Sequence, residues 1–135
     1  MTDAAHARVN ISSGTPWEER VGYSRAVRIG NLVYTSGTTA MKEDALVGIN
    51  DPYAQTVQIL ANIAWALNEA GATMRDVVRY RVYLVDIHDW IEVARALKET
   101  FGAVRPCSTL LAVAALIDPA MRVEIEVDAV VAPPV

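Results

Sequence analysis

The chain has 135 residues, of which 53% are hydrophobic and 21% are charged, and this composition is typical of one ordinary globular domain. A net charge of −4 argues against a nucleic-acid-binding surface, which needs clustered Lys and Arg. The longest apolar run, over residues 110–117, is too short to span a bilayer. We therefore expect one domain over residues 1–135 that binds neither nucleic acid nor membrane.

The cysteine content and the N-terminal segment indicate the cellular compartment in which the protein is expected. Cys107 is the only cysteine and cannot form a disulfide within the chain, as expected in a reducing environment. Residues 1–10 lack the basic and apolar sections of a signal peptide, so we expect a cytoplasmic protein. A domain of this size also leaves little interior for a ligand cavity, so we expect small-molecule sites between the subunits of a homo-oligomer.

The first half of the chain predicts a hairpin and a helix. Two strand-like runs within residues 24–37 flank Gly30-Asn31, a pair suited to the positive dihedral angles of a tight turn. A short extra strand at residues 8–12 can precede this hairpin. Asp51-Pro52 supplies a cap and a first-turn proline for a long helix that ends at Gly71. Its expected apolar stripe is Val57, Leu60, Ala64 and Leu67.

The second half predicts three strands around a second helix. Residues 77–86 are rich in β-branched and aromatic side chains and alternate Val78, Tyr80, Val82 and Leu84 with Arg79, Arg81 and Tyr83. Asp89 and Glu92 resemble a capping box for a helix that closes at Gly102. The expected stripe of this helix is Trp90, Ala94, Leu97 and Phe101. Strands over residues 107–114 and 121–131 follow, separated by the turn signal Asp118-Pro119.

This β-β-α-β-α-β-β order predicts an α+β fold in which two helices pack on one face of a sheet. The other face carries alternating charges, with Arg79 and Arg81 on one strand and Glu124, Glu126 and Asp128 on the last. We expect that partly polar face to be a subunit interface.

Motifs for cofactors and metals give no positive signal. The sequence has no glycine-rich phosphate loop and no nucleophile elbow, and its one cysteine and two separated histidines are too few for a zinc site. We expect no metal and no cofactor.

Three long segments carry a family resemblance. They are GYSRAVRIGNLVYTSG at residues 22–37, DPYAQTVQILANIAWALNEAGATMRDVVRYRVYLVDIHDW at 51–90 and RPCSTLLAVAALIDPAMRVEIEVDAVV at 105–131. In order and spacing they resemble the RidA/YjgF family. The resemblance implies a chorismate-mutase-like fold and a homotrimer with clefts between neighbouring subunits. It also implies cofactor-free hydrolysis of enamines and imines, such as 2-aminoacrylate, to 2-oxo acids and ammonia.

One family position differs. Active deaminases of the family carry Pro-Ala-Arg after the second helix, and that arginine binds the substrate carboxylate. Here the segment is Pro106-Cys107-Ser108-Thr109, which places Ser108 at the arginine's position. A serine donates one neutral hydrogen bond where a guanidinium offers a charged fork, so the substitution argues against the usual 2-imino acids as substrates.

The other matching positions imply a site. Glu126 corresponds to the family glutamate expected to activate the attacking water. The expected substrate-binding residues are Tyr23, Ser36, Gly37, His88, Cys107, Ser108 and Thr109.

Structural interpretations of these residues stay open. Glu124 and Glu126 can be cross-strand partners of Arg79, Arg81 or Arg122, Cys107 can be a small buried apolar residue, and His88 can be a helix-terminus residue. Two functions remain: an enzyme that hydrolyses an enamine or imine in an intersubunit cleft, or a non-catalytic small-molecule-binding or regulatory trimer.

Overall fold

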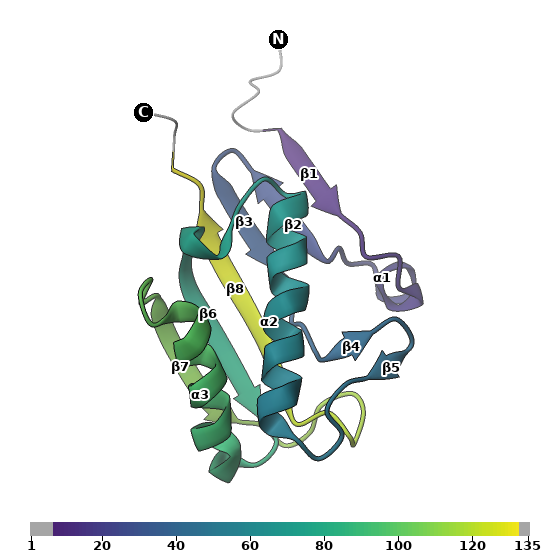
Figure 1. Cartoon of the computed structure of the whole chain (residues 1–135). Helices are drawn as coiled ribbons and strands as arrows, with labels where there is room; N and C mark the ends of the chain where they lie inside the picture. Colours follow the sequence, from purple (N-terminus) through teal and green to yellow (C-terminus); the bar gives the residue numbers. More distant parts are fainter. Residues whose placement is uncertain (1–6, 133–135) are drawn as a thin grey trace.

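The computed structural model describes residues 7–132, which form a sheet covered on one face by two long helices (Figure 1). The strands of this sheet are β1 (Arg8–Ile11), β2 (Ala26–Ile29), β3 (Leu32–Thr35), β6 (Val77–Leu84), β7 (Cys107–Ala112) and β8 (Val123–Val130). The two long helices are α2 (Pro52–Glu69) and α3 (Trp90–Phe101). The expected α+β architecture is confirmed.

The six strands are ordered β1-β2-β3-β8-β6-β7 across the sheet. All neighbours are antiparallel except β6 and β7, which are parallel and are connected through α3. A parallel pair needs such a crossover, and α3 packs beside α2 on the same face of the sheet. β1 and β7 are therefore the edge strands, and β8 lies in the middle although it comes last in the sequence.

The hairpin and the first helix form for the expected reasons. Gly30 has a φ of +58° in the β2–β3 turn, a value that glycine adopts without steric cost. The side chain of Asp51 accepts a hydrogen bond of 3.0 Å from the backbone N–H of Ala54 and so caps α2. The short extra strand exists as β1.

Some details of burial differ from the expected stripes. Val57 is 45% exposed and Trp90 is 51% exposed, whereas Ile59, Ile63 and Val93 are fully buried. The buried faces of α2 and α3 therefore overlap the predicted stripes but extend beyond them, because the position of the sheet decides which side of a mostly apolar helix is covered. Four residues of the predicted stripes are buried as expected: Leu60, Leu67, Leu97 and Phe101.

The predicted alternation of β6 is wrong at Val78, where a β-bulge interrupts the pairing with β8. Val77 pairs with Ala129 and Arg79 pairs with Asp128, so Val78 has no partner. The bulge leaves Val78 46% exposed and buries Val77 instead. From Arg79 onward the alternation is as predicted.

The predicted capping box of α3 is wrong. Asp89 makes no side-chain cap, and its carboxylate instead accepts two hydrogen bonds from Arg122, at 2.8 and 3.1 Å. The two charge-assisted hydrogen bonds from the Arg122 guanidinium are stronger than the single bond that a backbone N–H would give to Asp89. They connect the start of α3 to the segment before β8.

Short elements were not expected from the sequence. These are helix α1 (Pro16–Val21), the small hairpin of β4 (Met41–Lys42) and β5 (Ala45–Leu46), and the 3-10 turns η2 (Met74–Asp76) and η3 (Ile87–Asp89). Each is too short to show a hydrophobic period. Helix α1 lies at the outer end of the sheet, next to β1 and β2 (Figure 1).

A buried amide connects α2 to the segment before β8. Gln55 is fully buried and donates to the carbonyls of Gly48 and Ala120, at 3.1 and 2.9 Å. Its side-chain oxygen accepts a hydrogen bond of 2.9 Å from the backbone N–H of Arg122. Both polar atoms of this amide group have hydrogen-bond partners, as buried polar groups require. Because two of the partners belong to Ala120 and Arg122, these bonds hold the segment that precedes β8 against α2.

Candidate functional site

The candidate site lies on the face of the sheet that the helices leave free, where β2, β3 and β8 meet. We call its central residues the Gly37 cluster: Tyr23, Arg25, Ser36, Gly37 and Glu124. Tyr23 and Ser36 line a hollow of about 470 Å³ beside α1, together with residues of β1 and β2. Three of these five residues, Tyr23, Ser36 and Gly37, are predicted site residues, and the structure brings them together.

The chain departs from regular pairing at Gly37. Tyr34 pairs with Asp128, and Thr38 forms a bridge with Ile125, so residues 35–37 oppose only residues 126 and 127. The extra residue is a bulge, a feature common beside active sites. It places Gly37 under the side chain of Glu124.

Gly37 leaves room for a carboxyl group. A Cβ atom at this position would lie 2.6 Å from Oε2 of Glu124 and 2.9 Å from its Cδ. Such contacts are too short, so only glycine permits this position of Glu124 unless that side chain moves. The backbone conformation of Gly37 is itself open to other residues, because its φ is outside the left-handed region.

The surroundings of Glu124 favour the protonated form of its carboxyl group. Burial raises the pKa of the Glu124 carboxyl above its ordinary value, Arg25 opposes this rise, and the neighbouring Glu126 adds to it. Within residues 7–132, no basic side chain forms an ion pair with Glu124. A carboxyl group with a raised pKa can donate a proton at a pH where exposed carboxyls are ionised.

Arg25 connects the parts of the cluster. Its Nη2 donates a hydrogen bond of 2.8 Å to the carbonyl of Gly37, and its Cζ lies 5.7 Å from the centre of the Tyr23 ring. Ser36 donates to the carbonyl of Ser24 at 2.6 Å, which fixes the end of the hairpin. A cation, a phenol ring and a carboxyl group therefore converge on one backbone segment.

Glu126, the predicted catalytic residue, has different neighbours. Tyr83 donates a hydrogen bond to its Oε1, and this bond raises the pKa of Tyr83. Nη1 of Arg81 lies 3.8 Å from Glu126 and 3.5 Å from Asp128. These are the cross-strand contacts that the structural interpretation expects, and the catalytic role of Glu126 stays a prediction.

The predicted residues of β7 lie elsewhere in the chain. Cys107, Ser108 and Thr109 are all exposed on this edge strand, and two strands, β6 and β8, separate them from β3. Cys107 is thus not the buried apolar residue that the structural interpretation expected. Ser108 pairs with Tyr80, whose side chain stacks on Phe101, so Ser108 lies on the helix side of the sheet.

His88 is also outside the Gly37 cluster. It belongs to η3, and its side chain is 89% exposed. Its backbone N–H and its Nδ1 both lie 3.0 Å from Oδ1 of Asp86. These contacts fit the turn that precedes α3.

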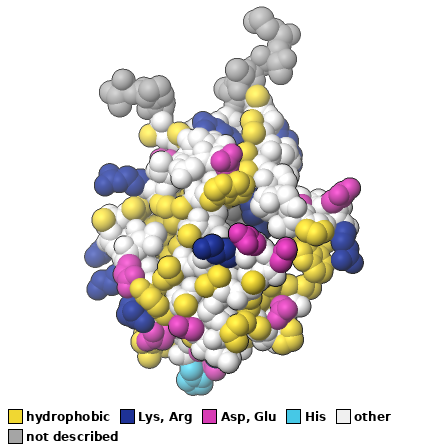
Figure 2. All heavy atoms as spheres, turned by 45° about the vertical axis from the view of Figure 1, so that its right-hand side comes forward, with side chains coloured by type: hydrophobic (Ala, Val, Ile, Leu, Met, Phe, Trp, Pro, Cys, Tyr) yellow, Lys and Arg dark blue, Asp and Glu magenta, His cyan; other side chains and the backbone are white. Residues whose placement is uncertain are grey.

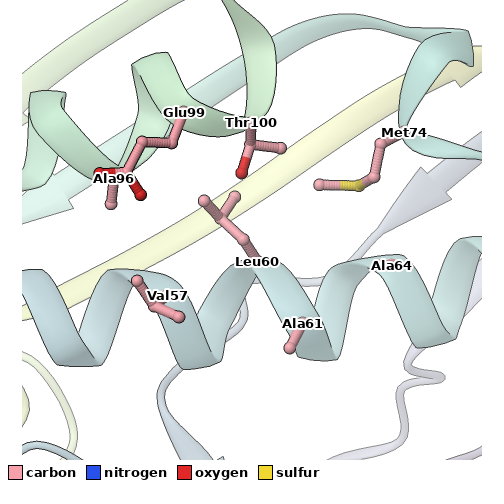
Figure 3. Close-up of a pocket in the computed structure, with 8 residues that line it drawn as sticks. All are labelled: Val57, Leu60, Ala61, Ala64, Met74, Ala96, Glu99 and Thr100. Atoms are coloured by element: carbon pink, nitrogen blue, oxygen red, sulfur yellow. The ribbon is translucent and has the colours of Figure 1, made fainter.

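A second hollow, of about 310 Å³, lies between α2 and α3. Figure 3 shows its apolar lining, with Leu60 and Met74 directed into the groove from α2 and η2. None of the predicted site residues lines it. Within the described part of the chain, three or more His, Cys, Asp or Glu side chains nowhere gather as a metal site would require, and no helix is long and apolar enough to cross a membrane.

Sequence reasoning missed Glu124 and Arg25. Glu124 and Glu126 share one face of β8, so the alternation alone cannot choose between them. The choice depends on the bulge at Gly37, which short-range patterns do not reveal. Arg25 stands at the beginning of the predicted hairpin next to Tyr23, and that proximity was the available signal.

The surface that comes forward when the view of Figure 1 is turned toward its right-hand side is mixed in charge. Figure 2 shows basic and acidic side chains interspersed among apolar ones, without a gathering of one sign. Such a surface suits small-molecule recognition better than binding to a polyanion.

Comparison with known proteins supports a family assignment. The family described as Endoribonuclease L-PSP matches residues 16–131. The crystal structure of Rv2704 from Mycobacterium tuberculosis, a member of the highly conserved YjgF/YER057c/UK114 family, is 47% identical with a TM-score of 0.85, over 93% of this chain and all of that one.

Two characterised relatives also match. The 3-aminoacrylate deaminase RutC of Acinetobacter baylyi is 30% identical over 85% of this chain and 90% of its own length. The 2-iminobutanoate/2-iminopropanoate deaminase of Dermatophagoides farinae is 32% identical over 77% of this chain and 81% of its own length. With these matches spanning the sheet, both long helices and the Gly37 cluster, the chain belongs to the RidA/YjgF family and has its chorismate-mutase-like α+β fold.

Proposed function

We propose that the protein hydrolyses an enamine or imine to a carbonyl compound and ammonia, with Glu124 as the group that transfers protons. The observation that carries this proposal is the half-buried carboxyl of Glu124 over Gly37, in the same cluster as Tyr23 and Arg25. The deaminase activities named for two relatives give the reaction class.

The reaction needs one proton donor and one acceptor at the same place. Protonated Glu124 donates its proton to the enamine carbon and forms the iminium ion. The resulting carboxylate then accepts a proton from the water that adds to the C=N carbon. Glu124, which is now protonated again, donates this proton to the nitrogen of the tetrahedral adduct and accepts the proton of its hydroxyl group as ammonia leaves and the carbonyl forms. Glu124 ends in its starting protonation state, and water is the only co-reactant consumed.

An assay of ammonia release tests the proposal. Purified protein is added to imines formed in place by an amino-acid oxidase, to 3-aminoacrylate and to 2-aminomuconate. We expect faster ammonia release than in buffer for at least one of them. Equal rates with and without protein for every substrate would contradict the proposal for this substrate class.

Non-catalytic binding of a small molecule at the Gly37 cluster is the second candidate. It is favoured by Ser108, which offers one neutral hydrogen bond where the family resemblance expects an arginine. Stabilisation of the fold by 2-oxo acids without any turnover in the same assay would support binding over hydrolysis.

We further propose that three copies assemble through the helix-free face of the sheet, so that β7 of one copy closes the cleft of the next. Leu32, Tyr34 and Leu111 point from this face and are 38%, 45% and 41% exposed. Cys107 and Thr109, which alternate with Ser108 along β7 and lie on the helix-free face, would then reach the Gly37 cluster of a neighbouring copy. The family resemblance supplies the number three.

The mass of the particle formed by the purified protein, measured by sedimentation, tests the proposed assembly. We expect a particle of three times the chain mass of 14.7 kDa, and Leu111→Glu should dissociate it because a charge would be buried at the interface. Ile91→Glu is the matched control, since Ile91 is 60% exposed on α3 and should leave the particle intact. A wild-type protein that sediments as a single chain would overturn the proposed assembly.

A further inference from the structure

Arg25 is the basic side chain within the Gly37 cluster, and its contacts leave most of its donors unused. A guanidinium offers five N–H donors in a planar fork. The structure gives one of them a partner, the carbonyl of Gly37. The Nε–H is buried and has no hydrogen-bond partner among the described residues.

The charge of Arg25 also lacks a counter-ion in residues 7–132, since no Asp or Glu oxygen lies within 4.0 Å of it. The charge of Arg25 acts to lower the pKa of two nearby carboxyl groups, those of Glu18 and Glu124. Glu18 already accepts hydrogen bonds from the backbone N–H and the hydroxyl of Ser13. Glu124 is held toward its neutral form by burial.

A half-buried cation without a counter-ion is costly, and proteins retain such groups where a ligand supplies the missing charge. The cation is also held in place. The Tyr23 ring lies along the guanidinium, and the Gly37 carbonyl fixes one end of the fork. A preorganised guanidinium of this kind suits a carboxylate, which can accept two parallel N–H bonds.

We propose that Arg25 binds the carboxylate of the substrate and thereby sets the specificity of the Gly37 cluster for anionic enamines and imines. This inference rests on the proposed hydrolysis for the identity of the ligand, but carboxylate binding is measurable without turnover. The substrate is then held from the β2 side, with its C–N carbon directed toward Glu124. Ser108 is not needed for charge recognition in this arrangement.

Binding of pyruvate and of its uncharged analogue pyruvamide, measured by NMR titration, tests the proposal. We expect wild-type protein to bind pyruvate about 10- to 100-fold more tightly than pyruvamide, the range for hydrogen bonds to charged groups. Arg25→Gln should remove this preference, and Arg25→Lys should keep part of it, because lysine retains the charge without the fork.

Arg20→Gln is the matched control. Arg20 lies in α1 with its Cζ 5.1 Å from the Trp17 ring, so the variant removes the same charge and the same type of aromatic contact in the same part of the chain. We expect its preference for pyruvate to equal that of wild type.

Three results would overturn the proposal: pyruvate affinity of Arg25→Gln within twofold of wild type, equal wild-type affinities for pyruvate and pyruvamide, or no saturable pyruvate binding. The wild-type comparison stays decisive if Arg25→Gln fails to fold. The Nε–H signal of Arg25, assigned by its loss in Arg25→Lys, should also shift with pyruvate alone. Arg25-dependent binding without ammonia release would contradict hydrolysis and leave this carboxylate site standing.

Discussion

Glu124→Gln is expected to lower the rate of ammonia release by about 10²- to 10⁴-fold, the usual contribution of a general acid–base group. Glutamine keeps the size and the position over Gly37 but cannot donate and recover a proton. The measurement is kcat on whichever substrate wild type hydrolyses fastest. Glu126→Gln is the matched comparison on the same face of β8, where it removes the negative charge that faces Arg81 but keeps an oxygen that can accept the hydrogen bond from Tyr83.

The two glutamate variants decide between the two assignments. A loss in Glu124→Gln alone supports Glu124, and a loss confined to Glu126→Gln would restore the residue that the sequence predicted. A loss of equal size in both would mean that the two carboxyls act together, which the rise that Glu126 adds to the pKa of Glu124 allows.

Stability against pH gives Glu124→Gln an independent readout. The pKa of Glu124 in the folded protein lies above its ordinary value of 4.5. Its contribution to stability is therefore fully present below that value and is lost as the pH rises through the folded-state pKa. Glutamine stays neutral, so the variant should unfold at a higher temperature than wild type in neutral buffer and at the same temperature near the ordinary pKa. A lower unfolding temperature in neutral buffer would contradict the raised pKa.

Gly37→Ala is expected to reduce turnover by about 100-fold or more, as misplacement of a catalytic group by an ångström can do. The new Cβ would lie 2.6 Å from Oε2 of Glu124, so the carboxyl must shift away from its position over residue 37. The backbone tolerates alanine here, and we expect the folded structure and the unfolding temperature to change little. The same kcat measurement, with circular dichroism as the folding check, tests this.

A double-mutant cycle shows whether Gly37 acts through Glu124. In a Glu124→Gln background the cost of Gly37→Ala should largely disappear, because the group it displaces no longer transfers protons. Full additivity of the two losses would mean that Gly37 serves the site in another way, such as the approach of substrate to its backbone.

The fold could be predicted to a large extent because its main elements obey local rules. Asp51-Pro52 begins α2, Gly30 turns the hairpin, and the apolar strands alternate as a half-buried sheet requires. The errors arise where a distant partner decides. Asp89 binds Arg122 instead of capping its own helix, and the bulge at Val78 depends on its pairing with β8.

The site could be predicted only in part for the same reason. Tyr23, Ser36 and Gly37 are close in the sequence and stay together in the structure. The partner carboxyl is fixed by the register between β3 and β8, because the bulge at residues 35–37 decides which residue of β8 lies over Gly37. In the proposed assembly the β7 residues contribute to the site of a neighbouring copy, whose position does not follow from the sequence of one chain.

β8 is the last strand in the sequence but lies between β3 and β6 in the sheet, so the order of synthesis affects when the sheet can be completed. A ribosome delivers β8 after all the other strands, so until residues 123–130 emerge, β3 and β6 lack the strand that joins them. The earlier part of the nascent chain can form the β1–β2–β3 meander and the β6–α3–β7 unit, but it cannot place any carboxyl over Gly37. Assembly of the Gly37 cluster is therefore coupled to completion of the sheet.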